Sequence, residues 1–381
     1  MTSIPTTAEA RALAPRDYTL TGESSRRAVE VGLSAAEWYH TEVPRKVMKE
    51  LMARTDGPAL RDTILWIALH ILFGGLAVWL SVTGHVWWSV PFWIAYGVLY
   101  GSACDSRWHE CGHGTAFRTP WMNDAVYHIA SFQVMRNPVN WRWSHARHHT
   151  DTIIVGRDAE IAWMHPIRLG LKALAYVGLV DAWQSFKVLW RNARGEISAD
   201  EKDYIPASEW PKVIFWARVH MTIYGLTALV ALGMFMGGLG WRSVIPFMLI
   251  GLPRLYGCWH MVMTGLLQHG GLAEDVLDHR LNSRTVYMNP VSRWIYWNMN
   301  YHVEHHMFPM VPYHALPRLH EVIKHDLPPP NPSIWAAYRE MFGAVMRQRR
   351  EPGTYLRREL PATARPYKGE LHQAVPERTP A

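Results

Sequence analysis

The chain has 381 residues and carries 39 Lys and Arg against 32 Asp and Glu, which gives a formal net charge of +7. The mean hydropathy of -0.11 is typical of a soluble protein, but long apolar runs are diluted here by polar segments, so a soluble class does not follow. The basic residues form no patterned element of the kind that binds nucleic acid, and the odd number of cysteines, three, indicates reduced thiols.

Residues 1–60 are polar and are interrupted by prolines. This composition excludes a cleaved secretory signal and predicts a cytoplasmic N-terminal arm with one or two short helices. The membrane domain is expected over residues 61–325. Residues 326–381 are expected to form a cytoplasmic C-terminal segment that ends in a flexible basic tail.

Four apolar runs predict two transmembrane helical hairpins. At about 1.5 Å per residue, each run is long enough to cross a hydrocarbon core of about 30 Å, the second only marginally. The turns within the two pairs are short, so both hairpins are expected to project from the same side of the membrane. The predicted spans are residues 63–82, 86–103, 213–237 and 244–268.

The basic residues predict the orientation of these spans. The first hairpin turn has no Lys or Arg and the second has only Arg242, whereas the termini and residues 104–212 are rich in both. By the positive-inside rule, the rich side is cytoplasmic. We therefore expect an all-α, multi-pass integral membrane protein with a cytoplasmic helical cap.

Two smaller features concern charges near the spans. Residues 165–195 alternate apolar stretches with charged residues, which predicts an amphipathic helix at the membrane interface. Arg254 lies within the fourth predicted span, where an unpaired charge is costly. It is expected either to pair with a neighbouring helix or to bind a polar group of a substrate.

Three histidine clusters carry the chemistry of the chain: HECGH at 109–113, HARHH at 145–149 and YHVEHH at 301–306. Histidines three and four residues apart share one face of a helix, so each cluster presents convergent nitrogen donors. One such cluster is explained by surface histidines near a helix end, but three clusters with the same spacing indicate a metal site. The histidines are His109, His113, His145, His148, His149, His302, His305 and His306.

The number and position of these histidines favour two metal ions. Eight imidazoles are too many for one ion of four to six ligands, but they suit two adjacent coordination spheres. The first cluster follows the second span, the second lies in the cytoplasmic segment between the hairpins, and the third follows the second hairpin, so all three are expected on the cytoplasmic side. Imidazole binds zinc, copper, iron or nickel; iron is preferred because a dinuclear iron site activates oxygen and attacks unactivated C–H bonds of an apolar chain.

Nearby carboxylates are candidates for orienting the histidine rings, since a metal-bound histidine usually donates its other N–H to such a group. Each of them is equally explained as a solvent-facing charge. The candidates are Asp105, Glu110, Asp151, Asp158, Glu160 and Glu304.

Two other functions have to be weighed. HECGH matches the HExxH pattern of zinc metalloproteases, with Glu110 as general base, but a protease leaves the second and third clusters unexplained. A metal transporter needs ionisable or soft ligands along its spans, and this chain has few.

HECGH, HARHH and YHVEHH, arranged around two hydrophobic hairpins, closely resemble the three histidine boxes of the membrane fatty acid desaturase and hydroxylase superfamily. The resemblance covers roughly residues 60–325. It implies a helical membrane fold with two iron ions that use O2 and two electrons. It also implies one more ligand, His269, after the fourth span, which brings the expected metal ligands to nine.

The chain departs from the family pattern in two ways. The acyl-CoA desaturase branch has Asn four residues before the extra histidine, whereas this chain has Gly265. Asn298 or Asn300 is a candidate replacement, and the alternative is that water or no residue takes this place. Front-end desaturases have Gln at the start of the third box and a fused haem domain, whereas this chain has His302 and no such domain. Electrons are therefore expected from a separate ferredoxin-like protein, attracted to the basic face.

The resemblance implies an oxygen-dependent desaturase that introduces a C=C bond into an acyl chain linked to a lipid or a thioester. A hydroxylase or monooxygenase of the same superfamily is the alternative, because both reactions start from the same iron pair. A smaller specialised metabolite is an alternative substrate.

Overall fold

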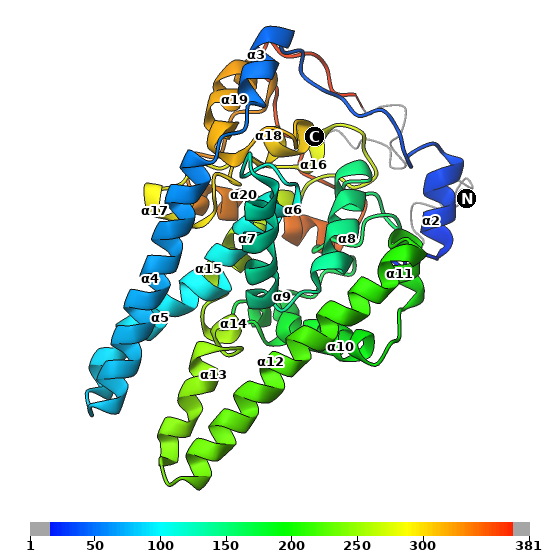
Figure 1. Cartoon of the computed structure of the whole chain (residues 1–381). Coiled ribbons are helices and arrows are strands. Elements are labelled where there is room, and N and C mark those ends of the chain that lie inside the picture. Colours follow the sequence, from blue (N-terminus) through cyan, green and yellow to red (C-terminus); the bar gives the residue numbers. More distant parts are fainter. Residues whose placement is uncertain (1–15, 369–381) are drawn as a thin grey trace.

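The computed structural model describes residues 16–368 (Figure 1). Over this range the chain is helical, without a named β-strand, and isolated bridges join Thr285 to Tyr301 and Val286 to Asn331. The predicted all-α class is therefore confirmed for the described residues.

The first hairpin consists of α4 (Gly57–Val82) and α5 (Val86–Gly101). Pro58 lies in the first turn of α4, where its missing N–H costs nothing. The chain reverses at Gly84, whose φ of 90° suits glycine. The indole of Trp66 on α4 donates to the carbonyl of Leu99 on α5 at 3.0 Å, which ties the two helices together.

The second hairpin begins with α12 (Trp210–Met236), but its returning arm is broken. That arm consists of η2 (Gly240–Val244), α13 (Ile245–Leu249), α14 (Pro253–Tyr256) and α15 (Trp259–His269). Gly251 has a φ of 91°, and Pro253 has no N–H to donate to a continuous helix. The prediction of one uninterrupted span over residues 244–268 is therefore wrong.

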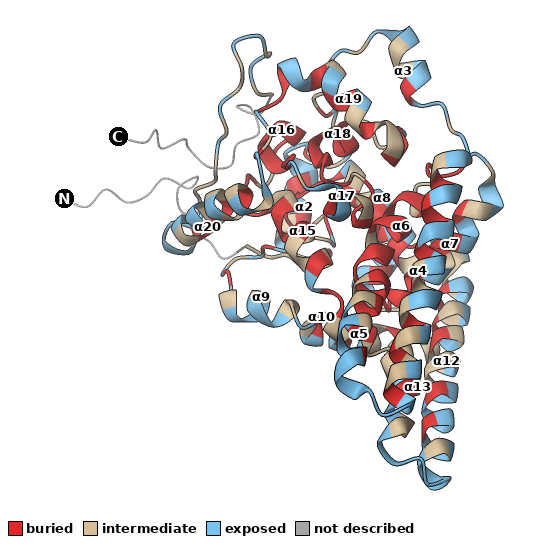
Figure 2. Cartoon of the chain, turned by 90° about the vertical axis from the view of Figure 1, so that its left-hand side faces the viewer, coloured by how far each residue is buried: buried red, intermediate tan, exposed pale blue. Residues whose placement is uncertain are grey.

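Two helical stretches of the described chain are long and apolar enough to cross a membrane: Gly57–Val82 and Ala207–Met236. The helix that pairs with α4, α5, has only 16 residues. The arm that pairs with α12 is interrupted. Both hairpins project to the same side of the molecule, at the bottom of Figure 1. Large apolar side chains are exposed there, including Ile71 at 72% and Leu229 at 64%, as expected for a surface that faces lipid (Figure 2).

The other helices form a cap at the opposite end, where the buried residues are concentrated (Figure 2). They are α2 (Glu23–Glu30), α3 (Arg45–Leu51), α6 (Ala103–Gly112), α7 (Pro120–Gln133), α8 (Pro138–Thr150), α9 (Leu169–Ala175), α10 (Leu179–Ala193), α11 (Ala199–Tyr204), η1 (Ala207–Glu209), α16 (His279–Asn282), α17 (Pro290–Ile295), α18 (His302–Met307), η3 (Tyr313–Ala315), α19 (Leu316–Ile323), η4 (Lys324–Asp326) and α20 (Ile334–Arg350).

The segment after α20 packs against the cap as far as the structure describes it. Arg280, fully buried, donates to the backbone carbonyls of Arg365 and Pro366, both at 3.0 Å. The amide of Leu356 donates to the carbonyl of Gly271 at 2.8 Å. Up to residue 368 this differs from the expected flexible tail, because a buried guanidinium needs acceptors that the segment supplies. Residues 1–15 and 369–381 lie outside the described range.

Candidate metal centre

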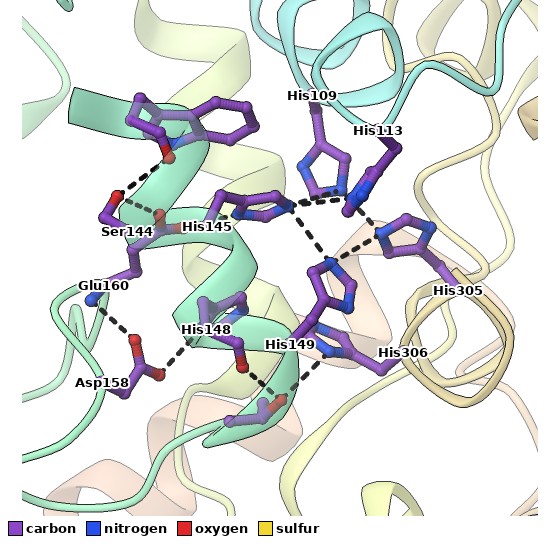
Figure 3. Close-up of polar contacts among 12 residues, drawn as sticks. His109, His113, Ser144, His145, His148, His149, Asp158, Glu160, His305 and His306 are labelled. Atoms are coloured by element: carbon purple, nitrogen blue, oxygen red, sulfur yellow. Dashed lines mark hydrogen bonds and ion pairs between the residues drawn. The ribbon is translucent and has the colours of Figure 1, made fainter. Parts of the chain in front are cut away.

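Three cap helices and α15, the last helix of the second hairpin, present the predicted histidines; Figure 3 labels those of the first two boxes together with His305 and His306. α6 carries His109 and ends at His113, and α15 ends at His269. α8 carries the second box; it is capped by the preceding Asn137, whose side-chain oxygen accepts hydrogen bonds from the amides of Val139 and Asn140. α18 carries the third box. The three- and four-residue spacings therefore lie on helices, as predicted.

The structure brings all nine histidines together in two groups. In each group every histidine offers one ring nitrogen, and these nitrogens lie within 4.8 Å of one another. The groups are neighbours, because the rings of His149 and His306 stack with centroids 4.6 Å apart. The five-histidine group is His109, His113, His145, His149 and His305, and the four-histidine group is His148, His269, His302 and His306.

Contacts between ring nitrogens test whether a metal ion fits. In the five-histidine group, Nε2 of His145 lies 3.2 Å from Nε2 of each of three other histidines. In the four-histidine group, Nε2 of His302 lies 3.1 Å from His269 and 3.0 Å from His306. One imidazole nitrogen cannot form three hydrogen bonds. Metal–nitrogen bonds of about 2.0–2.1 Å, in contrast, place adjacent ligand nitrogens about 3 Å apart, so both groups fit an ion.

Hydrogen bonds on the far side of the rings orient three of these histidines. Nδ1 of His145 contacts Glu160 at 2.9 Å, and Nδ1 of His148 contacts Asp158 at 2.8 Å. These carboxylates are two of the six predicted candidates. Nδ1 of His269 contacts the carbonyl of Asn282 at 2.7 Å, a partner that sequence spacing did not reveal. A proton held at Nδ1 leaves the Nε2 lone pair for a metal.

The protonation states of His113 and His269 also suit metal binding, whereas Asp158 raises the pKa of His148 against the effect of burial. Burial lowers the pKa of His113 to about 4 and that of His269 to about 3, and neighbouring His148 acts in the same direction. Both rings are therefore neutral near pH 7, and neutral imidazole is the form that binds metal.

The other predicted carboxylates have different surroundings. Glu304 accepts from Thr285 at 2.6 Å and pairs with His320, which is outside both groups. Asp151 pairs with Arg157 at 3.1 Å. No hydrogen bond from the Asp105 carboxylate to a histidine is present in the described residues. Glu304 has its partners outside both groups because it lies on a different face of α18 from His302, His305 and His306.

Glu110 lies beside the centre, with Oε1 3.6 Å from Nδ1 of His305, on the side of that ring away from the Nε2 atoms that converge in the five-histidine group. Its carboxylate accepts from the amide of Tyr313 at 3.0 Å and from the hydroxyl of Thr115 at 3.1 Å. Burial raises its pKa to about 8. His109 and His113 share their group with histidines from the other two boxes, which a protease does not need. The metalloprotease interpretation therefore has no structural support.

Gly265 stands where the acyl-CoA desaturase branch has Asn, and the structure is open at this position. Gly265 lies four residues before His269 on α15, and no atom lies within 4 Å of where its Cβ would be. The amides of the two candidate replacements are used elsewhere: Asn298 donates to the carbonyl of Tyr313 and Asn300 to that of Val286.

Arg254 is paired with a neighbouring helix. Its guanidinium, 1% exposed, forms an ion pair with Asp181 on α10. Asp181 also pairs with Arg136 at 2.9 Å. Of the two predicted roles for Arg254, the structure supports pairing between helices.

Comparison with known proteins identifies relatives. The sunflower (Helianthus annuus) sn-2 acyl-lipid omega-3 desaturase (ferredoxin), chloroplastic, is 24% identical over 331 residues, 78% of this chain and 66% of its own length. The temperature-sensitive sn-2 acyl-lipid omega-3 desaturase (ferredoxin), chloroplastic, of Arabidopsis thaliana is 25% identical over 301 residues, covering 71% and 62%. The sn-1 oleoyl-lipid 12-desaturase of Anabaena variabilis is 30% identical over 153 residues, covering 35% and 42%.

The chain thus spans just under two thirds of the length of the two plant proteins. The family model described as fatty acid desaturase matches residues 85–338, well over half of the chain. This match includes all three histidine boxes and His269. The chain therefore belongs to the fatty acid desaturase family.

Proposed function

We propose that the protein is an oxygen-dependent desaturase that introduces a C=C bond into an acyl chain linked to a lipid or a thioester. The two histidine groups carry the proposal, because each offers several neutral imidazoles at the spacing of a coordination sphere. The names of the relatives, acyl-lipid desaturases, favour desaturation over hydroxylation.

The nine histidines would hold two iron ions, five on one and four on the other. Bound there, the iron pair supplies oxygen activation and attack on an unactivated C–H bond. Glu160 and Asp158 keep protons on Nδ1 of His145 and His148, so that Nε2 of each ring faces the metal.

The overall reaction takes one hydrogen atom from each of two adjacent carbons. With O2, two electrons and two protons, it yields the alkene and two molecules of water. The two electrons come from a separate ferredoxin-like donor. The names of two of the relatives include the word ferredoxin.

In this proposal the apolar hairpins lie in the bilayer and the cap is cytoplasmic. The broken arm α13–α15 and the short α5 complete four crossings together with α4 and α12. Residues 1–60 form a cytoplasmic arm, 61–325 the catalytic domain and 326–381 a cytoplasmic segment. A histidine centre at the base of the cap then meets acyl chains that enter from the lipid.

Product analysis tests the function. The full chain is expressed in a bacterial host, and its membrane lipids are compared by mass spectrometry with those of a host that expresses His305→Ala. We expect new double bonds, 2 Da lighter per event, only with the wild-type protein and only with oxygen. A gain of 16 Da identifies a hydroxylase instead, and unchanged lipids contradict the proposed acyl-lipid substrate.

A further inference from the structure

A surface pocket in the cap reaches one of the metal-group histidines. An outer pocket lies between Arg16 and the segment Pro352–Tyr355, and an inner pocket is lined by His269 and Trp163. The two pockets share His165, Leu272, Glu274 and Gln348. His269 is half-buried, whereas the other three members of its group are buried. The four-histidine group is thus accessible from the surface on this side.

The acidic residues at the mouth of the pocket already have partners. Glu274 forms an ion pair with Arg16 and accepts from the hydroxyl of Tyr18 at 3.1 Å. Asp275 accepts from the amide of Val155 at 2.8 Å. The charge of Glu274 is therefore offset by Arg16, whereas the hydrogen bond from a neutral amide leaves the charge of Asp275 in place.

The charge next to the pocket is basic. Gln348 lines both pockets, and the arginines on either side of it, Arg347, Arg349 and Arg350, are exposed at the end of α20. We call these three arginines the basic rim. Glu351 is the only carboxylate in residues 347–351, so this stretch has a net positive charge. Such a surface attracts acidic partners and speeds their association.

We propose that the basic rim and the pocket form the docking surface for a small acidic carrier of one electron, of the [2Fe–2S] ferredoxin class. The carrier delivers electrons on the His269 side, to the four-histidine group. This inference rests on the proposed function, because desaturation consumes two electrons. Two reduced carriers supply them in each turnover, and each is oxidised by one electron.

A second basic surface provides a matched control. Lys46 and Lys49 are exposed on α3, at the top of Figure 1, and neither lines the pocket at His269. Reversing two charges there changes the net charge of the protein as much as reversing two at the basic rim. A donor attracted only by overall charge responds equally to both changes.

The experiment compares Arg349→Glu/Arg350→Glu with Lys46→Glu/Lys49→Glu in the full-length, iron-loaded protein in lipid nanodiscs. The probe is a plant-type [2Fe–2S] ferredoxin. Its Kd is measured by calorimetry at low and high salt, and oxygen-dependent product is measured with reduced ferredoxin or with reduced methyl viologen.

We expect the rim variant to raise the Kd about ten-fold or more at low salt, with a smaller difference at high salt. We expect the α3 variant to stay within about two-fold of wild type.

Turnover with methyl viologen should be the same in all three proteins, because this small reductant needs no docking surface. An unchanged Kd in the rim variant, or an equal or larger change in the α3 variant, overturns the inference. A rim variant that also loses the viologen-driven reaction overturns it as well, since the damage is then not confined to docking. If wild type forms no product with either reductant, the proposed function fails, while the Kd comparison still decides the docking surface.

Discussion

Glu110 and His305 come from different histidine boxes, and Oε1 of Glu110 lies 3.6 Å from Nδ1 of His305. Both side chains are fully buried. Through its other oxygen, Glu110 also holds the amide of Tyr313, which follows the third box in the chain. The carboxyl group of the first box thus supports the position of the third box. This contact gives Glu110 a role although it belongs to neither histidine group.

Glu110→Gln is therefore expected to weaken the metal centre without abolishing it. The amide keeps the shape of the side chain but replaces one carboxyl oxygen with an NH2 group, which cannot accept a hydrogen bond either from the amide of Tyr313 or on the side of His305 Nδ1. We expect a loss of about 10- to 100-fold in iron affinity or activity, as for other groups that orient ligands. Anaerobic ferrous titration and oxygen-dependent product formation measure the two quantities.

The control is Glu304→Gln, because Glu304 is equally buried but pairs with His320. It should lower thermal stability more than iron affinity. An inactive Glu110→Gln that binds iron as tightly as wild type contradicts the supporting role and indicates that Glu110 takes part directly in the reaction.

Single ligand deletions should empty one half of the centre. His305→Ala removes one member of the five-histidine group and His306→Ala one of the four-histidine group. We expect each variant to hold about one iron ion per chain where wild type holds about two. Elemental analysis after anaerobic loading gives the count.

His320→Ala is the matched control for these deletions, since His320 is buried and lies in neither group. It should retain about two iron ions per chain. One tightly bound zinc ion in wild type, unaffected by His305→Ala, is the result that contradicts a dinuclear centre.

The arrangement of the histidines was predictable because it depends on local geometry. Spacings of three and four residues put the rings of each box on one helix face, and the structure has those helices. The assignment of His148 to a different group from His145 and His149 was not predictable. It depends on how α8 packs against α15 and α18, and sequence spacing carries no information on that packing.

The membrane arms illustrate a second limit. The apolar run over residues 244–268 predicts one helix by length, but Gly251 and Pro253 break it where the chain packs closely on α5. A Cβ at Gly257 would lie 1.8 Å from the carbonyl oxygen of Gly97. Apolar composition is the same for a straight span and a broken one, so hydropathy cannot separate them. Glycine and proline within the run were the available signals.

Breaking the pair of Arg254 with Asp181 should destabilise the fold. Asp181→Asn leaves a guanidinium that is 1% exposed without its carboxylate. Removing one partner of a buried pair typically costs about 3–5 kcal/mol, and we expect the lower end because Asp181 is 31% exposed. Thermal unfolding in detergent measures the change.

Two further variants separate the buried charge from general damage. Asp124→Asn breaks the exposed pair with Arg142 and should cost less than about 1 kcal/mol. The double variant Asp181→Leu/Arg254→Met should recover most of the loss, because the buried guanidinium is then gone and only Arg136, whose side chain is 40% exposed, loses a partner. A single variant as stable as wild type contradicts a structural role for this pair.

The remaining prediction concerns topology, and it follows from the shared direction of the two hairpins. Their turns contain Gly84 and Gly240, and the exposed loop between α10 and α11 in the cap contains Gly195. A short epitope tag is inserted after each of these glycines in the full chain, and tag accessibility is measured in intact spheroplasts before and after permeabilisation. The apolar hairpins and the base-poor turns predict that the tags at Gly84 and Gly240 are accessible from outside, whereas the tag at Gly195 becomes accessible only after permeabilisation. If the tag at Gly84 or Gly240 becomes accessible only after permeabilisation, the hairpin that carries it does not cross the membrane. If the tag at Gly195 is accessible from outside, the cap is not cytoplasmic.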